Sequence, residues 1–171
     1  SRTNILEANY ICDMVFEHFK TSKQSLGVVA FSDVQARLIE DLIEERLHKN
    51  PECIKYFSDE CDEPFFVKNL ESVQGDERDR IIFSICYGYN EDNKFYQRFG
   101  PLNNLGGERR LNVAITRAKY NISVVSSIRY VDIKSTESLG SKLLKEYLQF
   151  SENVETEKRS TESENGLVLS I

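Results

Sequence analysis

The residues best suited to chemistry in this chain are two arginines within the segment 108–119. Arg110 and Arg117 are seven residues apart. On a helix of about 3.6 residues per turn, this spacing places them on nearly the same edge, beside Ala114 in the apolar stripe. A guanidinium whose stem packs along a core is held stiffly, and its planar fork of donors suits a phosphate. The spacing therefore predicts a phosphate contact, although an amphipathic helix with surface arginines is the plain alternative.

A second candidate is the polar segment 69–79, which lies between two apolar runs. A tight turn needs only about four residues, and this segment is much longer. Most of its side chains can form hydrogen bonds with sugars and phosphates. The alternative is an acidic surface turn in which Gly75 supplies a positive φ angle. The length favours a functional segment.

The third candidate, 31–35, directly follows the first apolar run. Ser32 and Gln35 have the spacing of a helix-capping box, in which each side chain bonds to the other residue's backbone. A cap and a ligand contact are compatible, so both interpretations stay open.

The elements that must position these segments alternate along the chain. Largely apolar runs predict strands at 26–31, 65–67, 80–87 and 121–126. Periodic patterns predict helices at 5–20 and 33–49, one opening at Gly107 and continuing through Ala118, and one over 139–150. Apolar strands alternating with helices predict an α/β fold with a parallel sheet. In such sheets ligands bind outside the carboxyl ends of the strands, where we expect the three segments.

Composition limits the size and the partners of this domain. With 171 residues and 40% hydrophobic content, the chain is long enough for one buried core, which we place in residues 1–150. Residues 151–171 are acidic and polar, which predicts a linker or a disordered tail. The net charge of -6 means that any contact with nucleic acid must come from a local patch.

Metal and membrane sites are not expected. The four cysteines form no CxxC pair, and only two histidines could join them, so we expect no zinc site. No run approaches the roughly 20 apolar residues of a membrane span, and the first residues do not resemble a signal peptide. These features predict a cytoplasmic protein with reduced thiols.

Together the three segments resemble motifs of superfamily 1 helicases. Residues 26–35 resemble motif IV, residues 71–77 resemble motif V, and residues 109–119 resemble motif VI, which is the most specific. The likeness is greatest to the up-frameshift branch and to large multidomain bacterial helicases, and it covers residues 1–150. It implies the second RecA-like domain of a helicase core, with a parallel sheet sandwiched by helices, which is a P-loop NTPase fold.

In that family ATP binds between two RecA-like domains, and the resemblance implies a role for each matched residue. Arg117 resembles the arginine finger that meets the γ-phosphate. Glu77 would contact the nucleotide, with Gln74 and Gly75 shaping its loop, and Arg110 would contact phosphates or position Glu77.

The implied nucleic-acid contacts are Ser32, Gln35, Asn69 and Ser72. Two of these positions depart from the family, because Phe31-Ser32 stands where Pro-Tyr is common and Asn69 where Ser or Thr is common. The expected partners are single-stranded nucleic acid, with DNA favoured over RNA, and the first RecA-like domain of the same polypeptide.

This chain lacks a Walker A loop, GxxxxGK[ST], and a strand ending in Asp-Glu. We therefore expect ATP and Mg²⁺ to be held by the first RecA-like domain, and this domain alone to be inactive. A catalytically silent RecA-like scaffold that binds another protein is the alternative. A small nucleotide-binding protein of flavodoxin type is disfavoured, because 31–35 lacks the glycines that a phosphate would require.

Overall fold

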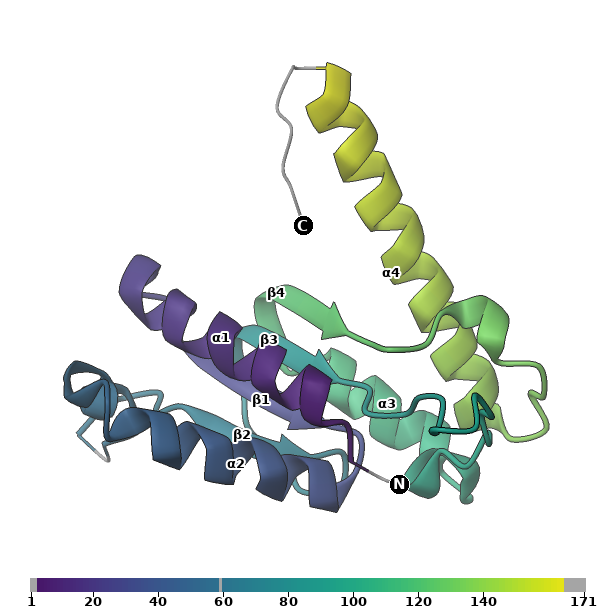
Figure 1. Cartoon of the computed structure of the whole chain (residues 1–171), viewed down its shortest axis with the longest axis horizontal. Coiled ribbons are helices and arrows are strands. Elements are labelled where there is room, and N and C mark those ends of the chain that lie inside the picture. The colour runs from purple at the N-terminus through teal and green to yellow at the C-terminus, as the bar shows by residue number, and fades with distance from the viewer. Residues whose placement is uncertain (1–2, 59, 165–171) are drawn as a thin grey trace.

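Four parallel strands form the centre of the computed structural model, which describes residues 3–58 and 60–164. Their order across the sheet is β2-β1-β3-β4. The strands are β1 (Leu26–Ala30), β2 (Phe66–Asn69), β3 (Arg78–Ser84) and β4 (Ala118–Val125). Helices α1 (Ile5–Thr21) and α2 (Asp33–Leu47) cover one face, and α3 (Gly107–Ile115) and the start of α4 (Leu139–Glu164) cover the other (Figure 1). The predicted α/β fold is confirmed.

Strand β1 is buried along its whole length because helices cover both faces of the sheet. Val28 and Ala30 belong to the core under α1 and α2, whereas Val29 and Phe31 belong to the core under α3 and α4. Two-sided burial explains why this strand reads as an unbroken apolar run.

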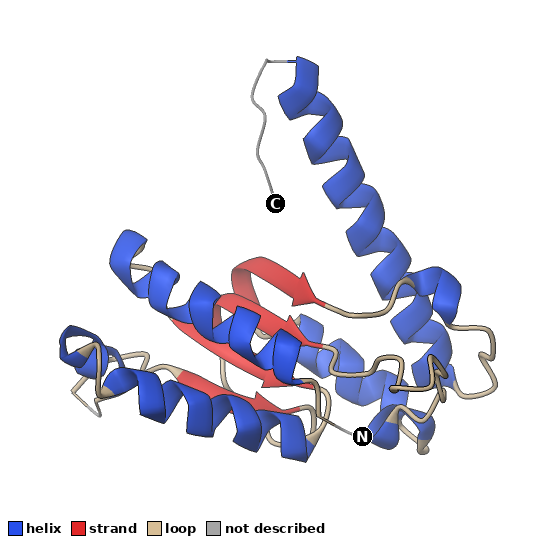
Figure 2. Ribbon diagram, in the orientation of Figure 1, coloured by secondary structure: helices blue, strands red, loops and turns tan. Residues whose placement is uncertain are grey.

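Helix α3 is shorter than the sequence predicted. It ends at Ile115, Thr116 and Arg117 form a turn, and β4 begins at Ala118 (Figure 2). The cause is the sheet, since Ala118 pairs with Arg78 of β3 and must be extended. Arg117 therefore lies beyond the helix, and the predicted common helix edge with Arg110 is wrong.

Helix α4 is longer than predicted. It continues past Phe150 to Glu164, so residues 151–164 are helical where the sequence predicted a linker or a disordered tail. Figure 1 shows the last turns of α4 extending away from the sheet. Residues 165–171 lie outside the described residues. No helix among the described residues is long and apolar enough to cross a membrane.

The link between β2 and β3 crosses the sheet without a helix. It begins at the carboxyl end of β2 and returns to the edge where β3 begins. Leu70 and Val73 anchor the link to the sheet, because both are buried in the core on the α3 side. This crossing brings the polar residues of the link alongside α3, where Glu71 pairs with Arg110.

Helices α3 and α4 both start against the carbonyl oxygen of Leu102. A Cβ atom at Gly107 would lie 2.2 Å from this oxygen, and one at Gly140 would lie 2.0 Å from it. We expect Gly107→Ala to lower the free energy of unfolding by about 1–3 kcal/mol, because the backbone must shift to admit the methyl group. Urea denaturation measures the change. Gly88→Ala, whose Cβ would meet nothing closer than 3.5 Å, is the control and should change little; equal losses in both variants would contradict the packing argument.

Candidate functional site

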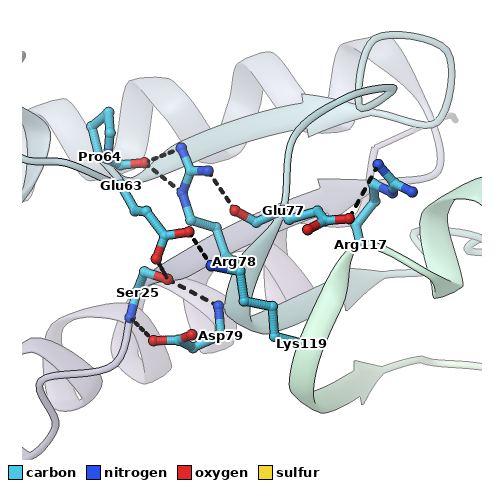
Figure 3. Close-up of polar contacts among 8 residues, drawn as sticks. All are labelled: Ser25, Glu63, Pro64, Glu77, Arg78, Asp79, Arg117 and Lys119. Atoms are coloured by element: carbon cyan, nitrogen blue, oxygen red, sulfur yellow. Dashed lines mark hydrogen bonds and ion pairs between the residues drawn. The ribbon is translucent and has the colours of Figure 1, made fainter.

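Glu77 and Arg117 face each other at the edge where β3 and β4 begin (Figure 3). Nη1 of Arg117 lies 4.0 Å from Oε1 of Glu77. Nε of Arg117 donates to the Val113 carbonyl at 3.0 Å, and Nη2 donates to Oγ1 of Thr116 at 3.1 Å. The Arg117 side chain is 18% exposed and that of Glu77 is 54% exposed. The guanidinium is thus oriented by its own turn, while its carboxylate partner is at the outer limit of an ion pair and could be replaced by another anion.

This pair does not lie at the carboxyl ends of the strands, so that expectation is wrong for Glu77 and Arg117. The link from β2 carries Glu77 across the sheet to the starting edge of β3. Helix α3 connects the far end of β3 with the start of β4 and brings Arg117 to the same edge. The N–H of Arg78 donates to the Arg117 carbonyl at 3.0 Å and joins the two segments.

The other predicted nucleotide contacts lie along α3. Nε of Arg110 is 3.6 Å from Oε1 of Glu71, and its Nη1 donates to the Leu105 carbonyl at 3.2 Å. Gln74 and Gly75 are exposed, and Gly75 has a φ of 88°. A shallow depression is lined by Leu70, Glu71, Gln74, Arg109, Arg110 and Val113. The predicted nucleotide contacts therefore lie on one side of the molecule. There the β2–β3 link forms two ion pairs, Glu71 with Arg110 and Glu77 with Arg117.

A second set of charges lies at the same edge as Glu77 (Figure 3). Glu63 forms an ion pair with Lys119 at the start of β4 and accepts from Oγ of Ser25 at 2.9 Å. The hydrogen bond from Lys119 lowers the pKa of Glu63 below its usual value. Ser25 and Asp79 exchange two further hydrogen bonds, of 3.0 and 2.9 Å. These contacts tie Ser25, just before β1, and Glu63, before β2, to the starts of β3 and β4.

Gln35 does not face nucleic acid as predicted, because its side chain has no exposed surface. Oε1 accepts from the Asn4 N–H at 2.7 Å, and Nε2 donates to the Asn4 carbonyl at 3.0 Å and to Oγ of Ser84 at 3.1 Å. Oγ of Ser32 is also buried and accepts from the Gln35 N–H at 3.2 Å, which is the first half of the predicted capping box. The second half is replaced by the bonds to Asn4.

Asn69 and Ser72 form a tight turn at the carboxyl end of β2 and remain accessible. Oδ1 of Asn69 accepts from the N–H groups of Glu71 and Ser72, both at 2.9 Å. Nδ2 of Asn69 donates to Oδ1 of Asp33 at 3.2 Å. Contact of this turn with nucleic acid stays a prediction.

Glu7 is a buried carboxylate whose role the sequence did not indicate. Its N–H bonds to the Asn4 side chain as a cap requires, but its carboxylate turns toward the ends of β3 and β4. It accepts from Oγ of Ser84 at 3.1 Å and from the N–H groups of Cys86 and Ser127, both at 2.8 Å. Burial raises the pKa of Glu7, and the backbone hydrogen bond from Cys86 opposes this shift. No local signal could have revealed partners so distant in the chain.

Comparison with known proteins identifies the relatives of this chain. A family model described as an AAA domain matches residues 1–129. The chain belongs to this AAA-domain family. The relationship to superfamily 1 helicases and the RecA-like fold, both predicted from the motifs, are confirmed.

The relatives of this AAA-domain protein are much longer proteins. One named as an uncharacterized ATP-dependent helicase, MG140 of Mycoplasma genitalium, is 47% identical over 136 residues, 76% of this chain and 12% of that protein. Its homolog in Mycoplasma pneumoniae is 41% identical over 158 residues, 87% of this chain and 14% of that protein. A Saccharomyces cerevisiae protein whose name describes an ATP-dependent RNA helicase, ECM32, is 37% identical over 89 residues, 52% of this chain and 7% of that protein.

Gln35→Ala tests the corrected role of that side chain. It leaves the Asn4 backbone groups and the Ser84 hydroxyl without these partners, so we expect the free energy of unfolding to fall by about 1–3 kcal/mol. Affinity of the folded full-length protein for a single-stranded oligonucleotide should be unchanged. Denaturation and fluorescence anisotropy measure the two quantities. Weaker binding at unchanged stability would return Gln35 to the nucleic-acid surface.

Proposed function

We propose that this domain is the second motor domain of an ATP-dependent superfamily 1 helicase or translocase. The observation that carries the proposal is Arg117, a guanidinium fixed by its own turn and only loosely paired with Glu77. The names of the Mycoplasma relatives describe ATP-dependent helicases, which supports the proposal. This chain spans only 12% and 14% of their lengths, so the complete motor requires further domains.

The residues fit one half of a nucleotide site. Arg117 supplies a cation, whereas the chain has no Walker A loop to hold phosphates. We therefore place the phosphate-binding loop and the Mg²⁺ ligands in the first RecA-like domain, the proposed partner of this surface. Bound ATP with Mg²⁺ supplies a γ-phosphoryl group that is transferred to water and gathers negative charge in the transition state.

In this proposal Arg117 reaches across the domain boundary as an arginine finger and donates to the γ-phosphate oxygens. The guanidinium is effective because its orientation is fixed before the reaction, so little reorganisation is needed as charge develops. Glu77, released from Arg117, contacts the sugar or phosphate region. Gln74 and Gly75 shape the loop beside it, and Arg110 lies farther along α3, where it can meet phosphates.

The proposed polymer is single-stranded nucleic acid, with DNA favoured over RNA, bound near Asn69 and Ser72 at the carboxyl end of β2. This turn belongs to the same link that carries Glu77. One segment therefore joins the edge of the sheet proposed to bind nucleic acid to the edge proposed to bind the nucleotide. ATP would draw the two motor domains together and hydrolysis would release them, which converts alternating grip into stepping.

Arg117→Ala in the full-length protein is expected to lower ATP turnover stimulated by single strands by roughly 10³-fold or more, because the transition state loses its arginine finger. A coupled ATPase assay with single-stranded DNA and RNA measures turnover, and circular dichroism checks the fold. Arg37→Ala, an exposed arginine on α2, is the matched control and should turn over normally. Unchanged turnover in Arg117→Ala, or no ATPase in the full-length protein, would favour a silent scaffold.

A further inference from the structure

Arg78 follows Glu77 in the chain, and its own contacts reach both members of the Glu77–Arg117 pair. Its N–H donates to the Arg117 carbonyl at 3.0 Å. Its Nη1 donates to the Glu77 carbonyl at 2.6 Å. Resting on the function proposed above, we propose that Arg78 is a positioning residue of the nucleotide site, which holds Glu77 opposite Arg117 without touching the nucleotide.

The side chain of Arg78 packs on the aromatic ring of Phe66. Its guanidinium carbon lies 4.8 Å from the centre of the Phe66 ring, and the Lys68 ammonium lies 5.4 Å from the same ring. The ring in turn lies on Gly27 of β1, where a Cβ atom would be only 2.5 Å from Cζ of Phe66. The missing side chain at Gly27 lets the ring sit close to the sheet, and the negative ring face attracts the cations.

The donors of Arg78 go to backbone carbonyls instead of a carboxylate. Nε and Nη2 both donate to the Pro64 carbonyl, at 2.8 and 2.6 Å, while Nη1 reaches Glu77 (Figure 3). Arg78 is only 9% exposed. A buried guanidinium that bonds to two separate segments holds them in a fixed relative position, because its donors lie in one plane. Lysine keeps the charge but cannot reproduce this fork.

Glu77 is fixed on both sides while its own side chain stays accessible. The preceding residue, Asp76, forms an ion pair with Lys68 of β2, and the following residue is Arg78. A Cβ atom at Gly75 would meet nothing within 4 Å, so Val73 is the last residue before Asp76 that the core buries. The backbone on both sides of Glu77 is thus tied to the two cations that lie near the Phe66 ring, and Arg78 is the one bonded to the Glu77 carbonyl.

The test compares Arg78→Lys with Arg46→Lys in the full-length protein. Arg46 is a partly buried arginine on α2, bonded to Asp13 and Asn9 on the opposite face of the sheet, and controls for the general loss of an arginine fork. We expect Arg78→Lys to lower kcat of the strand-stimulated ATPase by about tenfold to a hundredfold, because a displacement of about 1 Å costs that much. Arg46→Lys should leave kcat unchanged at a similar thermal midpoint.

A double-mutant cycle with Glu77→Gln separates positioning from general stability. If Arg78 acts through Glu77, adding Arg78→Lys to Glu77→Gln should lower kcat little further. Full kcat in Arg78→Lys, or additive losses in the cycle, would overturn the proposal. Should Arg78→Lys fail to fold, Phe66→Leu replaces it, with a smaller non-additive loss expected and an additive loss contradicting the proposal. Normal turnover of Arg117→Ala would instead overturn the proposed function itself.

Discussion

The register of β3 against β4 is the constraint on which the candidate site depends. Arg78 pairs with Ala118, so the residues just before them, Glu77 and Arg117, become neighbours at the starting edge of the sheet. These two residues are far apart in the chain and come from different connections. The register shifts by one residue between Arg78 and Arg80, since Arg80 pairs with Asn121. The Arg78–Ala118 pair therefore depends on this irregularity as well as on the buried pairs that follow it.

The link between β2 and β3 reaches both edges of the sheet without forming a helix. Parallel strands require a connection that returns from one end of the sheet to the other. Here the link is anchored by Leu70 and Val73 in the core, and its polar residues remain outside. One segment thus presents Asn69 and Ser72 at the carboxyl edge and Glu77 at the starting edge.

The strands could be predicted from the sequence because burial leaves a local pattern. The run 26–31 is apolar without interruption, and the structure buries β1 on both faces. Arg117 was harder, because the helical pattern of α3 continues through Ala118 in the sequence. Pairing of Ala118 with β3 ends the helix early, and this pairing depends on residues about forty positions away. The strand pairing of Ala118 therefore overrides the local preference of this segment for a helix.

Polar residues were the least predictable, since a buried glutamine and an exposed one look alike in a sequence. Gln35 and Glu7 form a buried network at the carboxyl edge, with hydrogen bonds to Asn4, Ser84 and Cys86. Buried polar groups of this kind are costly to disturb, because each lost partner leaves an unsatisfied group. The Glu77–Arg117 pair is different, since it is longer and partly exposed, and separating it costs little. The carboxyl edge therefore fastens α1 to the sheet through buried hydrogen bonds, whereas the starting edge orients Arg117 and pairs it with Glu77 only through a long, partly exposed contact.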